Sequence, residues 1–145
     1  PAPVLRVIEG GQKAEFSAAV RDVFFGSEFA VSQQSNRMGC RLNGPAIASP
    51  SGERLSEGTT YGTIQVPPNG QPIVLLNDRQ TIGGYPKLGA VLSLDCWKLA
   101  QCRPGATVSF KSITVEEAQD LVRTERAARE NMTLRRGGEG GVQQG

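Results

Sequence analysis

Histidine is missing from this sequence of 145 residues. Without an imidazole there is no Ser-His-Asp or Cys-His catalytic arrangement, and the commonest transition-metal ligand is lost as well. Chemistry must therefore use carboxylates, lysine, arginine, amides, hydroxyls or thiols, and no metal site is expected. The carboxylates of Glu57 and Asp78 could form an acid–base pair in space, but the sequence does not give their separation.

Cysteine is scarce and is not spaced for metal binding. Cys40, Cys96 and Cys102 are odd in number and form no CxxC pair, which argues against a zinc knuckle or a complete disulfide framework. Free cysteine commonly behaves as a small buried hydrophobe. We therefore expect reduced thiols in a cytoplasmic protein.

Long apolar runs and a strong charge imbalance are absent too. The longest apolar stretches, at residues 73–76 and 88–94, fall far short of the roughly 20 residues that a membrane-spanning helix requires. No secretory signal is visible at the start of the sequence. The formal net charge of +2 is too small to steer the protein onto nucleic acid. Neither a membrane nor a nucleic acid is an expected partner.

Glycine and proline are plentiful, with 18 and 9 residues, which favours a β-rich fold with many turns. We predict one mainly β domain at residues 1–130, a closed β-barrel with two or three peripheral helices, and a disordered glycine-rich tail at 131–145. Strands are expected at residues 3–8, 29–31, 40–42, 63–66, 71–76, 90–94 and 107–111. Helical segments are expected at residues 13–25, at 97–101 and from a capping box at Thr114 and Glu117 onward.

The clearest hairpin signal carries three side-chain amides. Alternation in residues 63–66 places Gln65 opposite the core-facing side chains, and the turn sequence PPNG brings Asn69 and Gln71 to the same hairpin end. Amides recognise planar, uncharged groups because each offers a donor and an acceptor. The alternative remains open that Asn69 only serves the turn and that both glutamines are solvated.

A second candidate region follows the strand at residues 71–76. Glycines let a backbone approach a ligand, and arginine presents a two-pronged donor to carboxylate or phosphate. A local ion pair and a flexible corner would be the structural alternative. The glycine pair fits neither a GxxxxGK[S/T] loop nor a GxGxxG turn, so no familiar nucleotide motif is present. The candidate binding residues are Asp78, Arg79, Gln80, Thr81, Gly83, Gly84, Tyr85 and Lys87.

Several motifs in unbroken order resemble one family. They are SNRMG at 35–39, LNGP at 42–45, SEG at 56–58, GTIQVPPNGQPI at 62–73, DRQTIGGYPK at 78–87 and LAQCRPG at 99–105. The sequence is similar, over roughly residues 4–125, to the biotin-dependent carboxyltransferase family. This family is also called allophanate hydrolase subunit 2, or KipA-like, and includes the C subunit of 5-oxoprolinase.

The resemblance implies a cyclophilin-like barrel that corresponds only to the C-terminal lobe of the usual polypeptide. It further implies ATP-dependent hydrolysis of 5-oxoproline to glutamate by a heteromeric complex, with this fragment alone inactive. The implied partners are the family's own N-terminal lobe, a KipI-like protein that serves as the B component of 5-oxoprolinase, and a LamB/YcsF-like A component. ATP is handled by the complex.

Two alternatives come with the same resemblance. One is carboxyl transfer from carboxybiotin to urea or a similar small amide, with biotin carried on another domain. The other is a non-catalytic, KipA-like module that binds an inhibitor of a sensor kinase.

The resemblance also suggests roles for the candidate residues. Gln65, Asn69 and Gln71 would contact the substrate amide, and Arg79 would stabilise an anionic carboxylate or phosphorylated intermediate. Asp78 would orient Arg79. Lys87 or Arg37 would add positive charge.

Overall fold

The computed structural model describes residues 2–9, 15–50, 57–80 and 82–144. The chain divides into two compact units, Pro1–Ile113 and Thr114–Gly145. The first unit contains two helices, α1 (Ala18–Gly26) and α2 (Ser93–Ala100). Its strands are β1 (Val4–Glu9), β2 (Glu28–Val31), β3 (Gly39–Asn43), β4 (Glu57–Gly58), β5 (Thr63–Gln65), β6 (Ile73–Leu75), β7 (Ile82–Gly83), β8 (Lys87–Val91) and β9 (Thr107–Ile113).

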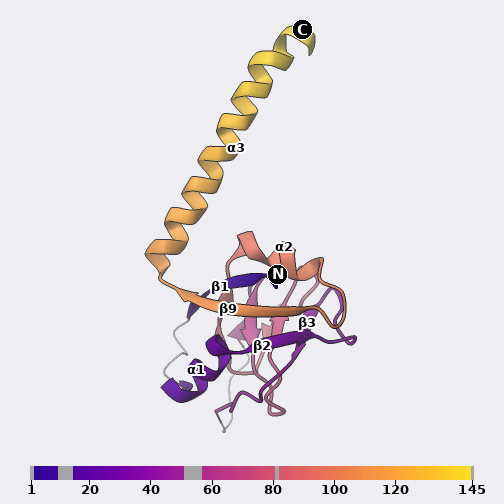
Figure 1. The fold of residues 1–145 in the computed structure, drawn as a ribbon, viewed down its shortest axis with the longest axis vertical. Coiled ribbons are helices and arrows are strands. Elements are labelled where there is room, and N and C mark those ends of the chain that lie inside the picture. The colour runs from indigo at the N-terminus through magenta and orange to yellow at the C-terminus, as the bar shows by residue number, and fades with distance from the viewer. Residues whose placement is uncertain (1, 10–14, 51–56, 81, 145) are drawn as a thin grey trace. The chain divides into compact units, whose positions relative to one another are not determined.

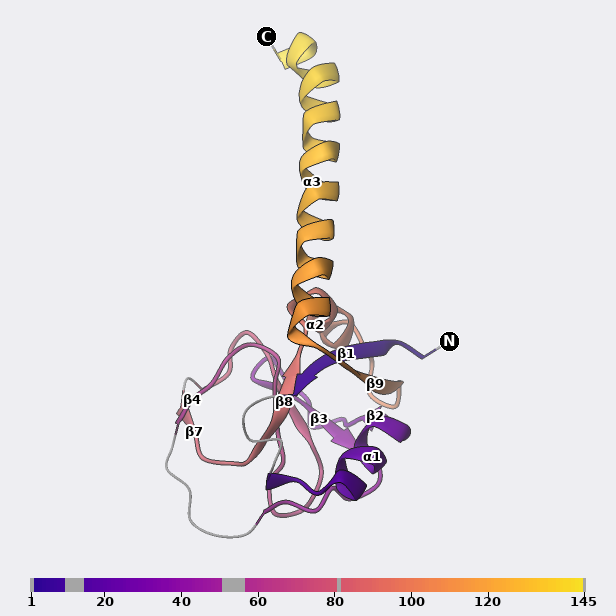
Figure 2. The same cartoon turned by 90° about the vertical axis from the view of Figure 1, so that its left-hand side faces the viewer.

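Seven of these strands form a closed barrel in the order β1-β8-β5-β6-β3-β2-β9. A parallel pairing of β1 with β9 completes the closure, and Figure 1 shows these two strands side by side. Strands β4 and β7 form a separate two-stranded sheet, which is visible beside the barrel in Figure 2. The prediction of a closed, mainly β barrel with peripheral helices is confirmed.

The core of the first unit contains a cluster of phenylalanines. Phe24 of α1 stacks on Phe110 of β9 with ring centroids 4.6 Å apart, and Phe29 of β2 contacts both rings. All three side chains are buried. Helix α1 begins where Ser17 Oγ accepts a hydrogen bond from Val20 N at 3.1 Å, so a capped amphipathic helix covers this part of the barrel.

The predicted hairpin is present, with β5 and β6 pairing antiparallel. Its turn depends on Gly70, which has φ +76 and whose N donates a hydrogen bond to Pro67 O at 2.9 Å. A Cβ at this position would lie 3.1 Å from the backbone N and O of Ile47. Glycine is therefore required both for the left-handed conformation and for the close approach of a second segment.

The predicted strand at residues 90–94 is wrong in its second half. Strand β8 ends at Val91, and helix α2 begins at Ser93. Asp95 lies in the first turn of the helix, where a carboxylate is favourable, and it is bound by Arg6 of β1. Residues 97–100 of the expected helical turn at 97–101 form the last part of this longer helix, and Gln101 is its C-cap residue.

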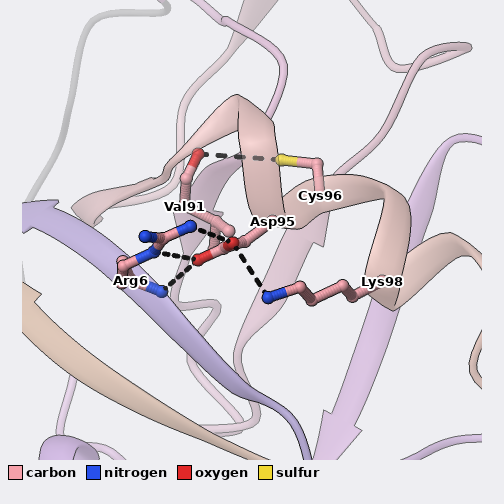
Figure 3. A network of polar contacts seen from close by, with 5 residues as sticks. All are labelled: Arg6, Val91, Asp95, Cys96 and Lys98. Carbon is pink, nitrogen blue, oxygen red and sulfur yellow. Dashed lines mark hydrogen bonds and ion pairs between the residues drawn. The ribbon is translucent and has the colours of Figure 1, made fainter. Parts of the chain in front are cut away.

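Asp95 is the centre of a buried polar network (Figure 3). Its Oδ2 accepts hydrogen bonds from Arg6 N at 2.8 Å and Arg6 Nε at 2.9 Å, and its Oδ1 accepts from Arg6 Nη2 at 2.7 Å. Lys98 Nζ lies 3.2 Å from Oδ1, whereas Cys96 Sγ turns to Val91 O at 3.6 Å. The Asp95 side chain is fully buried, so this network joins β1 to the start of α2.

The second unit is helix α3 (Val115–Gln144), and the predicted capping box opens it. Thr114 N donates to Glu117 Oε1 at 3.1 Å, and Glu117 N donates to Thr114 Oγ1 at 3.0 Å. The helix continues through residues 131–144, for which we predicted a disordered tail, and a domain boundary at residue 130 stays a prediction. None of the described helices combines the length and apolarity needed to cross a membrane.

Candidate functional site

A cavity of about 320 Å³ lies against strands β3, β5 and β6 of the barrel. This volume is at the lower end of the range of small-molecule sites, about 300–1,000 Å³. Five of the residues predicted from the sequence line it, namely Gln65, Gln80, Gly83, Gly84 and Tyr85. The remaining lining residues are Asn36, Met38, Gly39, Arg41, Thr59, Ile73 and Leu75.

Gln65 provides the most buried polar side chain of the cavity. It ends β5, where the pairing with β8 changes register between Ile64 and Gln65. Ile64 faces the core with no exposure, whereas Gln65 is 6% exposed and lines the cavity. The strand alternation predicted these opposite directions. Gln65 is mostly buried and faces the cavity, which differs from the alternative of a glutamine on the solvated surface. Within the described part of the chain, no hydrogen bond occupies the Gln65 side-chain amide.

Gly83 permits the close approach of the β7 backbone to this amide. A Cβ at Gly83 would clash with Gln65 Nε2 and would lie 3.2 Å from Thr59 Cγ2. Thr59 in turn donates a hydrogen bond from Oγ1 to Gln80 O at 2.5 Å. The loop between β6 and β7 is thereby fixed against the segment that follows β4, and both border the cavity.

The charge of the cavity comes from one side chain among the described lining residues. Arg41 of β3 is that cation, and no aspartate or glutamate belongs to the same set. The Arg41 side chain is exposed, while its backbone belongs to the barrel. A negatively charged group entering this cavity would therefore meet a guanidinium and no described carboxylate.

Asn69 and Gln71 do not reach this cavity, so the predicted convergence of three amides is wrong. Asn69 Oδ1 accepts a hydrogen bond from Gln71 N at 2.9 Å. Gln71 Oε1 accepts from Gly44 N at 3.0 Å, and Gln71 Nε2 donates to Gly44 O at 3.3 Å. Both side chains thus satisfy backbone groups around the hairpin turn, which was the structural alternative for Asn69.

The predicted charged residues lie elsewhere. Arg37 and Asp78 line a second cavity of about 330 Å³, where Asp78 N donates to Arg37 O at 3.1 Å. Arg79 is half-buried, its Nε has no hydrogen-bond partner, and among described residues it forms no ion pair with Asp78. Lys87 Nζ donates to Gly58 O at 2.9 Å. Thr81 lies outside the described residues, and the catalytic roles of these side chains stay predictions.

The family model for the carboxyltransferase domain, subdomains A and B, matches residues 1–112. The chain belongs to this carboxyltransferase domain family. The predicted family resemblance is thereby confirmed.

Two curated relatives are C subunits of 5-oxoprolinase. The Escherichia coli protein is 44% identical over 115 residues, which cover 79% of this chain and 37% of the relative. The Haemophilus influenzae protein is 38% identical over 127 residues, which cover 85% and 41%. This carboxyltransferase domain therefore spans about two fifths of the length of the curated relatives it matches. The Kluyveromyces lactis urea carboxylase structure has the same fold, with a TM-score of 0.78 at 23% identity, covering 88% of this chain and 12% of that one.

Sequence reasoning missed four polar or flexible lining residues of this carboxyltransferase domain: Asn36, Met38, Arg41 and Thr59. The motif at residues 35–39 contained a signal, but only its arginine was selected. Asn36 Oδ1 in fact accepts a hydrogen bond from Met38 N at 2.9 Å and shapes the loop before β3. Arg41 could have been predicted as a lining residue only from the pairing register of the strands, which cannot be derived from the sequence alone.

The three cysteine thiols of the domain form no disulfide and are weak nucleophiles. Burial raises the pKa of Cys40 and of Cys96 to about 11, and it also raises the pKa of Cys102. The thiolate is the nucleophile and metal ligand, so these cysteines are protonated packing groups at neutral pH. Among the described residues, no cluster of three or more acidic or thiol side chains is placed to hold a metal ion.

Proposed function

We propose that the chain is part of a 5-oxoprolinase and contributes the substrate cavity around Gln65 to a complex of several subunits. The relatives that support this proposal are 44% and 38% identical, and both are C subunits of 5-oxoprolinase. The proposed reaction is the ATP-dependent opening of 5-oxoproline, a small cyclic amide, to glutamate.

The buried amide of Gln65 is the observation that carries the proposal. A side-chain amide offers an acceptor oxygen and donor hydrogens, so it can bind a lactam N–H and a lactam carbonyl at once. Gln65 is 6% exposed, lines the cavity and has no described partner for this amide, so its donor and acceptor groups are available to a ligand. A planar amide in the cavity would satisfy both.

The rest of the reaction is assigned to the assembled complex. Water adds across the lactam carbon–nitrogen bond to give glutamate, while ATP is hydrolysed to ADP and phosphate. The sequence has no GxxxxGK[S/T] loop, so we assign ATP binding to partner proteins. Asp78, Arg79 and Lys87 remain the candidates for catalytic roles, and Arg37 and Thr81 for substrate binding.

Partner proteins are a necessary part of the proposal. The chain covers 37% and 41% of its two 5-oxoprolinase relatives, so it would require the family's N-terminal lobe. It would also require a KipI-like B component and a LamB/YcsF-like A component, and it would be inactive alone. Free thiols support assembly in a reducing compartment, which we take to be the cytoplasm.

Carboxyl transfer to urea is a second candidate function. Its support is a 28% identical relative, the urea amidolyase of Lachancea kluyveri, which matches over 119 residues. A urea molecule also presents a planar amide that Gln65 could bind. Biotin would then arrive on another domain. The higher identity to the 5-oxoprolinase relatives favours lactam opening.

The test is glutamate release by the reassembled complex supplied with ATP and 5-oxoproline. We expect release by the wild type, a large loss with Gln65→Leu, and no change with the matched control Gln33→Leu, whose side chain is exposed. The paired variants Asp78→Ala and Arg79→Ala test the predicted catalytic roles. Turnover of urea in the presence of carboxybiotin would favour the second candidate instead. Complex formation without any turnover would indicate a non-catalytic binding module.

A further inference from the structure

We propose that Arg41 binds the carboxylate of the substrate and restricts the cavity to small lactams that carry an acidic group. The inference rests on the proposed function and deepens it, because it names the group that binds the negatively charged part of the substrate. Arg79, the residue expected from the sequence to bind a carboxylate, is not among the described lining residues of this cavity, whereas Arg41 is.

The strand register places Arg41 and Gln65 on one face of the barrel wall. Arg41 of β3 is paired with Ile73 of β6, and Gln65 of β5 is paired with the same Ile73 from the other side. Directly paired residues on neighbouring strands point to the same face of a sheet. All three line the cavity, so Arg41 and Gln65 border it on opposite sides of Ile73.

The distance between the Arg41 and Gln65 backbones suits a compact substrate. Neighbouring strands lie about 4.8 Å apart, so two strand spacings separate the Arg41 and Gln65 backbones by roughly 10 Å. Both side chains are long enough to close much of that gap. In 5-oxoproline the lactam nitrogen is bonded both to the carbonyl carbon and to the carbon that bears the carboxylate. The lactam group of the molecule would face the amide of Gln65, while its carboxylate would face the guanidinium of Arg41.

The backbone of Arg41 is held firmly while its guanidinium stays available. Arg41 N donates a hydrogen bond to Ser35 Oγ at 2.9 Å, and Arg41 O accepts from Ser32 N at 2.8 Å and from Ser35 Oγ at 3.2 Å. No described carboxylate pairs with the side chain. A guanidinium can form two parallel hydrogen bonds with a carboxylate, and such charged bonds are stronger than neutral ones.

The other candidate cations are less suited to this role. Arg37 lines the second cavity with Asp78, and Lys87 Nζ is hydrogen-bonded to Gly58 O. Among the described lining residues of the Gln65 cavity, Arg41 alone is positively charged. The cavity therefore combines one buried amide with one cation, which matches a lactam acid better than a neutral amide.

The experiment compares two ligands that differ only in the carboxylate, namely 5-oxoproline and 2-pyrrolidinone. Calorimetric titration of the assembled complex without ATP measures both affinities. The variants are Arg41→Met, Arg41→Lys and the matched control Arg103→Met, whose side chain is exposed in the turn before β9. Thermal unfolding of each variant confirms that it is folded.

We expect the wild type to bind 5-oxoproline about tenfold to a hundredfold more tightly than 2-pyrrolidinone, the range for one charged hydrogen-bonded contact. Arg41→Met should remove this difference by weakening 5-oxoproline only, Arg41→Lys should restore part of it, and Arg103→Met should leave it unchanged. The inference is overturned if neither lactam binds, if Arg41→Met weakens both equally, or if it changes neither.

Adding ATP separates this inference from the proposed function. A complex that shows the Arg41-dependent preference but releases no glutamate would contradict the proposed function and leave the inference standing. A complex that releases glutamate with the same KM for 5-oxoproline in the wild type and in Arg41→Met would contradict the inference alone.

Discussion

At the scale of single residues, Asp95 shows how hydrogen bonds outweigh the cost of burying a charge. Burial raises the pKa of this carboxyl, but the hydrogen bonds from Arg6, and then from Lys98, overcome that effect and leave the pKa below its usual value. The same contact raises the pKa of Arg6. The pair is therefore ionised in the folded chain, and it links the first barrel strand to α2.

Breaking this pair from one side should be strongly destabilising. We expect Asp95→Asn to lower the free energy of unfolding by about 2–3 kcal/mol, because the partly exposed Arg6 guanidinium loses its charged hydrogen-bond partner. Lys98→Met is the control, with an expected loss below about 1 kcal/mol, since Lys98 is partly exposed. Urea unfolding measures both. Equal losses would show that the contact of Asp95 with Arg6 adds nothing beyond an exposed ion pair.

The lowered pKa of Asp95 also predicts how stability depends on pH. Its contribution is fully present above the unfolded pKa of about 3.8 and is lost as the pH falls through the lower folded pKa. We expect the wild type to lose unfolding free energy in this acid window more steeply than Asp95→Asn does. Urea unfolding at a series of pH values checks this. Parallel profiles for the two proteins would contradict it.

Gly83→Ala should impair the cavity without unfolding the barrel. The added Cβ would meet Gln65 Nε2, the end of a flexible side chain that can move aside. We expect the affinity of the complex for 5-oxoproline to fall at least tenfold while the melting temperature changes little. The control is Gly26→Ala in α1, where a Cβ would have nothing within 4 Å. A normal affinity in Gly83→Ala would show that the position of the Gln65 amide is unimportant.

At the scale of elements, the β5–β6 hairpin depends on two separate demands on Gly70. Its φ of +76 disfavours any side chain, and a Cβ would also be crowded by Ala46 and Ile47 at 3.1 Å. Gly105 has a similar φ of +89 but open space around it. We expect Gly105→Ala to cost about 1–2 kcal/mol, the conformational penalty alone, and Gly70→Ala to cost more. Chemical unfolding measures the difference, and equal costs would contradict the crowding.

Local chemistry made many elements predictable. The turn at Asn69 and Gly70 and the capping box at Thr114 and Glu117 both use short-range hydrogen bonds, which the sequence encodes directly. The end of β8 was missed because residues 90–94 form a short, mostly apolar run, which is also typical of a strand. Helix α2 begins inside that run, and its first turn is bound to Arg6, which is distant in sequence.

The candidate site was predictable only in part, because contacts between residues distant in sequence also determine which side chains line it. Gln65 was found because strand alternation separates it from Ile64. Arg41 was missed because it reaches the cavity through the shared pairing with Ile73, and such register comes from the fold. The roles expected for Asn69 and Gln71 failed because backbone groups already bind these side chains. The partner of Asn69 is local and belongs to the turn, whereas Gln71 binds Gly44, which is distant in sequence.

At the scale of the whole molecule, we expect the last residues to contribute little to stability. Glycine in a helix interior costs about 1 kcal/mol relative to alanine, and the last part of α3 contains four glycines, at 137, 138, 140 and 141. We expect deletion of residues 131–145 to change the free energy of unfolding by less than about 0.5 kcal/mol. Urea unfolding of the shortened and the full chain measures this change. A large loss of stability on deletion would contradict the expectation.

Because β1 and β9 close the barrel, β1 lacks this partner strand during much of protein synthesis. Strand β1 pairs with residues more than a hundred positions later in the chain, as in the match of Val4 with Ser109. At about 5–20 residues per second, β1 leaves the ribosome several seconds before β9 exists. Until then its hydrogen-bonding edge toward β9 is exposed to other nascent chains. A chaperone that shields this strand should therefore increase the yield of folded protein more than it changes its final stability.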